Sequence, residues 1–194
     1  MNRWLRWLAL SSAFAAAGMS SADAHAQRVT AANLDKSAIT FVARQMNVPT
    51  EGKFGKFTLQ LLFDPAKLNE SRVQLEVDLS SIDTGSEEAN DEVKGKAWFD
   101  VKNHPSARFV SSAVKGLGGN RYEVSGKMTI KGRTKDVTAP FSFKPDAQGG
   151  LFEGAFVLKR LDYAIGEGPW ADIETVADEV QVKFRVSGAA GRKP

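Results

Sequence analysis

The sequence predicts an all-β fold: an antiparallel barrel of about eight strands, with one short helical insertion. Several segments alternate apolar and polar residues with a period of two, which is typical of strands buried on one face only. Some of these runs reach about nine or ten residues, or roughly 30 Å at about 3.3 Å per residue. An antiparallel sheet of this size forms a sandwich or a barrel, and strands this long in a small domain favour a barrel.

Residues 1–26 are predicted to be a cleaved signal peptide. Arg3 and Arg6 give a basic start, residues 8–19 are an apolar run, and Ala24-His25-Ala26 supplies small residues two apart. Cleavage two residues earlier, after Ala24, fits almost as well, and an uncleaved anchor is the alternative interpretation. We expect a domain of residues 27–194 that is exported to a bacterial periplasm and is not an integral membrane protein after processing.

Composition argues against several classes of function. The chain has no cysteine, so disulfides and thiol chemistry are excluded. The formal net charge is +3, and no basic run is interleaved with aromatic residues. Nucleic acid is therefore not an expected partner.

The first half of the domain contains two strong strand patterns. Residues 39–41 predict a short strand and residues 49–55 a loop. The first long strand is predicted at residues 57–63. The most regular alternation covers residues 71–79, where valine and leucine oppose charged and polar residues at every step.

The pattern breaks at residues 80–103, where a short helix is predicted from Ser86 to Val93. Four acidic residues lie in this segment, and those in its first turn favour a helix start because the helix dipole attracts negative charge there. Trp98 and Phe99 follow closely. We expect these two side chains to hold the helix against an open end of the sheet.

Strand patterns resume in the second half. They cover residues 107–114, a hairpin at residues 122–143 with a tight turn at Lys131-Gly132, residues 152–158, and residues 179–187. A hairpin with one apolar face needs cover from the rest of the sheet, so these strands should share a single interior.

Five segments span nearly all of the predicted domain in a fixed order. They read SAITFVARQMNVPTEGKFGKF (37–57), VQLEVDLSSIDTGSEEANDEVKGKAWFDVKNHPSARFVSS (73–112), YEVSGKMTIKGRTKDVTAPFSF (122–143), FVLKRLDYAIG (156–166) and DEVQVKFRVSG (178–188). The ordered set resembles the YceI-like family of exported lipid-binding proteins. The resemblance implies a lipocalin-like barrel that holds a long isoprenoid chain, such as a polyprenyl or quinone tail, in its lumen.

The chain departs from this family at Gln45. The early segment of the family commonly ends in Lys-His-hydrophobic, whereas this chain has Arg44-Gln45-Met46. Glutamine donates and accepts hydrogen bonds but carries no charge and does not replace histidine as a metal ligand. A head-group role that depends on that histidine therefore does not carry over to Gln45.

Few residues point to catalysis or to a cofactor. His104 is the single histidine of residues 27–194, and no Gly-x-Ser-x-Gly motif accompanies it. Glu87, Glu88, Asp91 and Glu92 would suit a hard cation, but a solvated acidic helix face is the favoured interpretation. We therefore expect no catalytic residue, no metal site and no cofactor.

Apolar strand faces supply the candidate ligand-binding residues, although each of them would serve equally as ordinary core. Glycine and alanine at Gly126 and Ala139 would leave room for a lumen. Trp170 is a candidate lid or plug. Three residues, Arg160, Asp162 and Tyr163, are candidates for head-group contact, with a hydrogen-bonded pair that closes the sheet as the alternative. The full set is Phe57, Leu59, Leu61, Val73, Leu75, Val77, Phe109, Met128, Ile130, Phe141, Phe156, Arg160, Asp162, Tyr163 and Phe184.

The leading hypothesis is binding, storage or transport of a long-chain isoprenoid lipid without turnover. An enzyme acting on an amphiphile, such as a hydrolase, is the second hypothesis. It would use Glu or Asp of the helical insertion, and two carboxylates with raised pKa values facing a cavity would favour it. The third is a stress-related interaction protein without a ligand, which a solidly packed interior and a large apolar patch on the outside would favour. The sheet edges would permit a homodimer.

Overall fold

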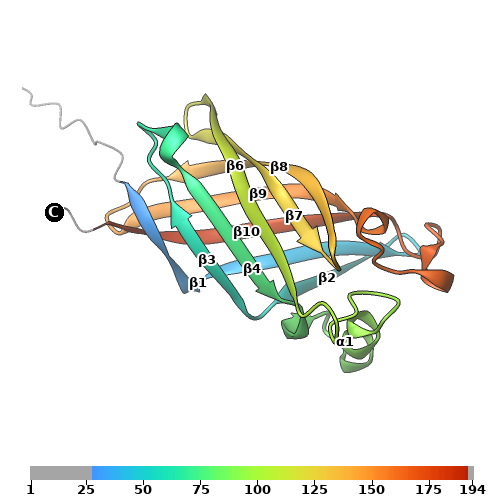
Figure 1. Cartoon of the computed structure of the whole chain (residues 1–194). Coiled ribbons are helices and arrows are strands. Elements are labelled where there is room, and N and C mark those ends of the chain that lie inside the picture. Colours follow the sequence, from blue (N-terminus) through green and yellow to red (C-terminus); the bar gives the residue numbers. More distant parts are fainter. Residues whose placement is uncertain (1–27, 192–194) are drawn as a thin grey trace, which may run out of the picture.

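A single antiparallel sheet, curled into a barrel, makes up most of the protein (Figure 1). The computed structural model describes residues 28–191, so the predicted signal peptide lies outside the described residues. Ten strands follow the order β3-β4-β6-β7-β8-β9-β10-β1-β2-β5 in the sheet. Their bounds are β1 Val29–Gln45, β2 Val48–Phe54, β3 Phe57–Leu62, β4 Arg72–Asp78, β5 Ile82–Asp83, β6 Ser106–Gly118, β7 Arg121–Ile130, β8 Arg133–Lys144, β9 Gly149–Lys159 and β10 Glu179–Ala190.

The sheet closes where the residue after edge strand β3 meets the start of β1. Val29 and Phe63 exchange two backbone hydrogen bonds of 2.9 Å. Strands β2 and β3 follow each other with only Gly55 and Lys56 between them, and β2 pairs with β1 while β3 pairs with β4. If β2 and β3 are counted as one bent strand and the two-residue β5 is left out, the barrel has eight strands. The predicted all-β, lipocalin-like fold is confirmed.

The predicted loop at residues 49–55 is wrong for residues 49–54, which belong to β2, while Gly55 lies between β2 and β3. Pro49 and Gly52 disfavour a strand locally, but pairing with β1 overrides that preference. The two-residue turn at Met46 and Asn47, with φ values of 47° and 64°, has the left-handed geometry that such hairpins require. Strand β1 is also longer than predicted, with 17 residues.

The central hairpin forms as predicted. Strands β7 and β8 pair from Arg121↔Ser142 to Ile130↔Arg133, and Lys131 and Gly132 make the turn with φ values of 48° and 72°. Both values lie in the left-handed region, which matches the twist of a two-residue hairpin.

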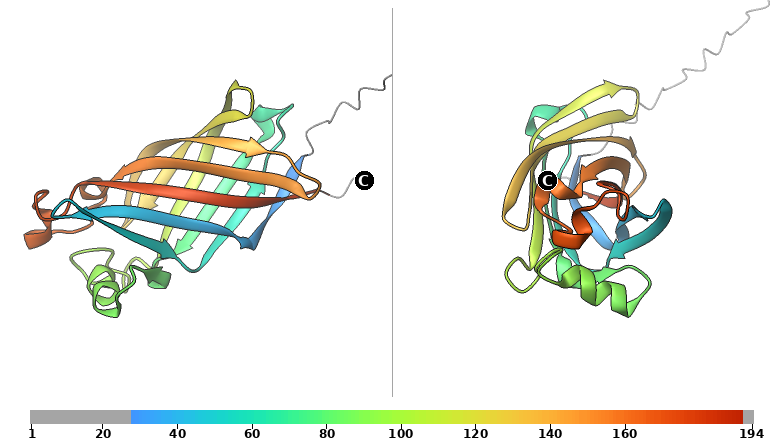
Figure 2. Two further views of the ribbon diagram at one scale, coloured as in Figure 1. Left: turned by 180° about the vertical axis from the view of Figure 1, so that it is seen from behind. Right: turned by 90° about the vertical axis from the view of Figure 1, so that its right-hand side faces the viewer.

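The predicted helical insertion is α1, Glu87–Lys94. The Ser86 hydroxyl caps it by accepting a hydrogen bond from the Ala89 N–H at 3.4 Å. Figure 1 and the end-on view in Figure 2 place α1 and residues 160–178 at the same end of the sheet. The remaining helical turns are short 3₁₀ segments, at Leu68–Glu70, Leu79–Ser81, Arg160–Tyr163 and Gly168–Ala171.

Buried side chains form two clusters, one toward each end of the barrel. The first centres on Phe63, Phe143 and Phe152, and the second on Leu79 and Tyr163. Within residues 28–191, no helix has both the length and the apolar composition to cross a bilayer.

Candidate functional site

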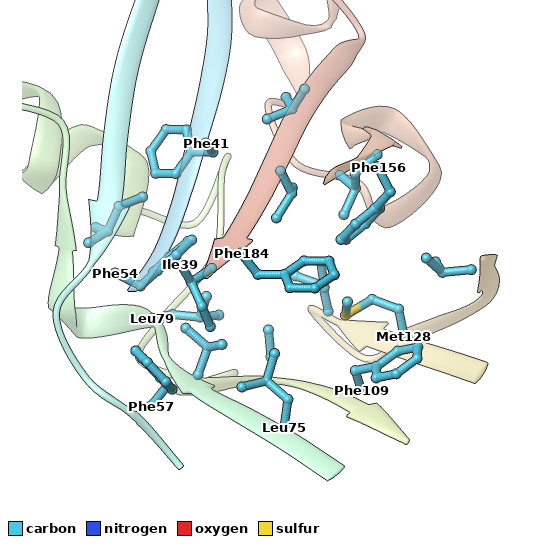
Figure 3. A pocket seen from close by; sticks show the side chains of 18 of the residues that line it. Ile39, Phe41, Phe54, Phe57, Leu75, Leu79, Phe109, Met128, Phe156 and Phe184 are labelled. Atoms are coloured by element: carbon cyan, nitrogen blue, oxygen red, sulfur yellow. The ribbon is translucent and has the colours of Figure 1, made fainter. Parts of the chain in front are cut away.

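A cavity of about 750 Å³ occupies the inside of the barrel between the two clusters. Its wall consists of the inward-facing apolar residues of the long strands, which the strict alternation of each strand directs to one face. Figure 3 shows these side chains converging on one space from several strands of the barrel. The volume falls within the range of small-molecule sites.

The structure brings almost all of the candidate residues to this wall. Asp162 and Tyr163 are the exceptions: Asp162 is exposed to solvent and Tyr163 is buried in the second core cluster. The residues that line the cavity are Phe57, Leu59, Leu61, Val73, Leu75, Val77, Phe109, Met128, Ile130, Phe141, Phe156, Arg160 and Phe184.

Aromatic side chains close one end of the cavity. The Phe63 ring, 2% exposed, lies 4.9 Å from the ring of Phe143 and 5.1 Å from that of Phe152, measured between centroids. Tyr122 and Phe141 complete the group at 5.2 Å and 6.0 Å from the same ring. Most of these pairs meet at the steep angles that aromatic quadrupoles favour. We call these five residues the aromatic floor.

The opposite end of the cavity, which we call the mouth, is polar and open to solvent. Helix α1 turns Glu88 and Glu92, one helical turn apart, toward the opening. Trp98 and Trp170 also line it, with ring centroids 5.4 Å apart. The hydrophilic lining residues at this end are Gln45, Thr50, Thr84, Ser86, Glu88 and Glu92.

Arg160 is a structural residue of the mouth. Its guanidinium donates to the carbonyl oxygens of Ala177 (3.1 Å), Ile165 (2.9 Å), Gly166 (3.1 Å) and Val176 (2.6 Å). Burial lowers the pKa of this guanidinium from its usual value, while the charge of Asp178 opposes that shift. With only 2% of the side chain exposed, Arg160 holds residues 160–178 in place and has little capacity left for a ligand.

Lys131 ties the same end together from the turn of the central hairpin. Its ammonium donates to the carbonyl oxygens of Lys96 (2.9 Å) and Ala164 (2.8 Å) and to Glu167 Oε2 (2.8 Å). This hydrogen bond lowers the pKa of the Glu167 carboxyl below its usual value. One side chain thus connects the segment after α1 with residues 160–178.

Trp98 carries an unpartnered donor. Among residues 28–191, its indole Nε1 is the one buried side-chain nitrogen or oxygen without a hydrogen-bond partner. The ring packs beside Trp170 and lies 5.8 Å, centroid to Cζ, from the Arg160 guanidinium. Burying an N–H without an acceptor costs free energy, which these ring contacts offset in part.

Several lining residues were absent from the sequence-based set. Ile39 and Phe41 have the period-two signal, whereas Phe54 lies in the segment predicted as a loop. The contributions of Glu88 and Glu92 depend on how α1 is oriented on the sheet, which no local pattern encodes. Lining residues of this kind can be identified only once the tertiary arrangement is known.

A curled antiparallel sheet with an apolar interior cavity, closed at one end, defines the class of lipocalin-like β-barrels. The YceI-like domain matches residues 31–188, and the chain belongs to this family. BcnA of Burkholderia cenocepacia is similar in structure, with a TM-score of 0.78 and 46% identity over 80% of this chain and 98% of that one.

One further relative agrees with this assignment, and a more distant solved domain shares the fold. A UPF0312 protein of Pseudomonas syringae pv. tomato is 32% identical over 142 residues, which cover 68% of this chain and 74% of the relative. A polyisoprenoid binding domain from Saccharophagus degradans has a TM-score of 0.61 at 19% identity, covering 86% of this chain and all of that one. At that identity the likeness concerns the fold.

Proposed function

We propose that this protein binds one long-chain isoprenoid-type lipid, with a polyprenyl or quinone-type tail, inside the barrel, and carries or stores it in the periplasm without chemical turnover. The enclosed apolar cavity with a closed floor and a polar mouth supports this proposal best. A long apolar chain gains about 0.8 kcal/mol for each buried CH₂ group, so few polar contacts are needed to hold it. The polyisoprenoid binding domain among the structural neighbours points to the same ligand class.

The orientation of the lipid follows from the two ends of the cavity. Packed rings at the aromatic floor offer no hydrogen-bonding group for a polar head apart from the Tyr122 hydroxyl, so the tail end belongs there. The head group then lies at the mouth beside Gln45, Thr50 and α1.

The charge of the mouth favours an uncharged head group. Glu88 and Glu92 line it, and the one basic residue among the described lining residues, Arg160, already donates to four carbonyl oxygens. A phosphate head would meet two carboxylates and no free cation, which costs free energy. Quinone and alcohol heads meet no such repulsion.

The competing functions have less support. Glu88 and Glu92 do face the cavity, as the enzyme hypothesis requires, but both are exposed to solvent at its rim. No histidine is among the described residues that line the cavity, and His104 lies next to the Gly132 turn on the central hairpin. A solidly packed interior, which a ligand-free interaction protein would have, differs from the hollow barrel described above.

The test is to purify the protein from its native host under mild conditions and to identify bound lipid by native mass spectrometry and by extraction. We expect about one long-chain isoprenoid lipid per chain. Protein that is repeatedly free of stoichiometric lipid would refute the carrier function.

A further inference from the structure

Three of the phenylalanines that line the cavity lie over glycines of the neighbouring strand. A Cβ atom added to Gly52 would come within 2.8 Å of both Cε atoms of Phe41. One added to Gly126 would lie 2.7 Å from Phe109 Cζ. Real Cβ atoms do not approach other carbons this closely, so each ring occupies the space that a side chain would need.

The strand register explains why these rings find glycine beneath them. Phe41 faces Gly52 directly across the β1–β2 ladder, and Phe184 faces Gly154 across β10 and β9. Phe109 pairs with Met128, and its ring reaches diagonally to Gly126, two residues before Met128 in β7. Figure 3 shows all three phenylalanines at the cavity wall. Aromatic rings commonly cover cross-strand glycines in this way, which shields the bare backbone.

Laying a ring over glycine changes the width of the lumen. A phenylalanine that stands perpendicular to the sheet would extend toward the centre of the barrel, whereas a ring folded onto its neighbour adds little more than its own thickness to the wall. Phe41 and Phe184 lie on the neighbouring strands β1 and β10, whereas Phe109 lies on β6, so the three rings border two separate parts of the cavity wall.

We propose that the pairs Phe41–Gly52, Phe109–Gly126 and Phe184–Gly154 set the bore of the lumen, and so determine the thickness of the apolar chain that fits. This inference rests on the proposed lipid-binding function and adds the residues that give it selectivity. A methyl-branched prenyl chain is thicker than an unbranched alkyl chain. Moving one ring into the lumen should therefore lower the affinity for a branched chain more than the affinity for an unbranched chain.

Gly52 offers the clearest test. The three atoms nearest to an added Cβ are all ring atoms of Phe41, so an alanine there acts first on that ring. Gly126 and Gly154 also lie close to the carbonyl oxygens of Val110 and Pro140, so substitution there would disturb the strands themselves.

The experiment compares Gly52→Ala with Gly55→Ala, in which the new methyl carbon would lie 3.5 Å from Ser81 O, an ordinary contact. The probes are geranylgeraniol, a branched C20 alcohol, and eicosanol, its unbranched counterpart, loaded from detergent and quantified by native mass spectrometry. We expect Gly52→Ala to lower affinity for geranylgeraniol relative to eicosanol by about tenfold, the order of effect for one extra methyl in a packed site. Gly55→Ala should retain the original ratio.

Two further variants keep the test decisive if Gly52→Ala folds poorly. Phe41→Leu alone should raise the ratio in favour of geranylgeraniol, and Gly52→Ala combined with Phe41→Leu should return it toward the original value. An unchanged ratio in folded Gly52→Ala, or in Phe41→Leu, would overturn the inference. Failure of the unmodified protein to bind either alcohol would instead contradict the proposed function.

Discussion

The two ends of the barrel are built on different physical principles. At the aromatic floor, rings from three strands (β7, β8 and β9) pack on one another and on Phe63 with no ionic contact among them. At the mouth, Arg160 and Lys131 hold irregular segments by donating to backbone carbonyl oxygens. One end is stabilised by packing, and the other by charge-assisted hydrogen bonds.

This difference between the two ends suits a barrel that is closed at the floor and open at the mouth. At the packed end, removing any ring leaves a cavity and lowers the stability of the fold. A hydrogen-bonded end keeps irregular backbone in a fixed shape while leaving space beside it, because directional bonds specify geometry without filling volume. Substitutions at the two ends should therefore have different consequences for stability and for binding.

The largest effect is expected for Phe63→Ala. Removing a fully buried ring from the aromatic floor should lower the free energy of unfolding by about 3–5 kcal/mol. Phe57→Ala removes a ring of the same size that borders the cavity and is half-buried, and should cost roughly 2 kcal/mol. Urea unfolding of both variants measures the difference. Equal losses would mean that the cavity is not a genuine void in the folded protein.

Arg160→Met should have the next largest effect. It leaves four backbone carbonyl oxygens without their donor, and we expect a loss of about 3 kcal/mol together with faster hydrogen exchange over residues 160–178. Arg185→Met is the matched control, since that guanidinium is 60% exposed and forms a surface pair with Glu153. Its substitution should cost about 1 kcal/mol or less. A uniform rise in exchange throughout the barrel would contradict a local role for Arg160.

Alkaline pH should weaken the mouth end through Tyr163. Burial, and secondarily the charge of Asp162, raises the pKa of this phenol to about 12. Because the folded-state pKa exceeds the unfolded value of about 10, the stabilisation is complete below pH 10 and is lost as the pH rises from about 10 to about 12. Tyr163→Phe should make the stability curve flatter in that window. Parallel curves for the two proteins would show that Tyr163 does not contribute.

The smallest effect is expected at the rim of the mouth. Replacing both Glu88 and Glu92 with glutamine should strengthen binding of an anionic amphiphile, geranylgeranyl phosphate, by roughly threefold at low salt, with geranylgeraniol unchanged. Glu87→Gln with Asp91→Asn removes the same charge from residues of α1 that do not line the cavity. Equal gains from the two double variants would mean that net charge, and not the position of the carboxylates, controls binding.

Much of the barrel follows from local sequence. In β4 and β10 every inward residue is apolar and every outward residue is polar or charged up to Ser187, so strand, face and register are encoded in the pattern. Strand β2 was missed because its inward positions are Thr50, Gly52 and Phe54, which carry a weak apolar signal. Its pairing with β1 is a tertiary effect.

The wall of the cavity was easier to predict than its mouth. Period-two alternation identified Leu59, Leu75 and Phe184, but the same signal is expected of a filled core and does not reveal a void. The sequence predicts Arg160, Asp162 and Tyr163 at the head group, yet Arg160 is engaged in hydrogen bonds to the backbone and Asp162 faces solvent. Position along a strand predicts the face of a residue, whereas contacts between loops depend on the assembled barrel.

A crystal structure of the protein purified with its native lipid would show whether the lumen holds the lipid, and in which orientation. We expect continuous density for a single apolar chain, running from the aromatic floor past Phe109 and Phe184, with its polar head at the mouth beside Gln45 and α1. A lumen that holds only water, or a head group located at the aromatic floor, would contradict this expectation.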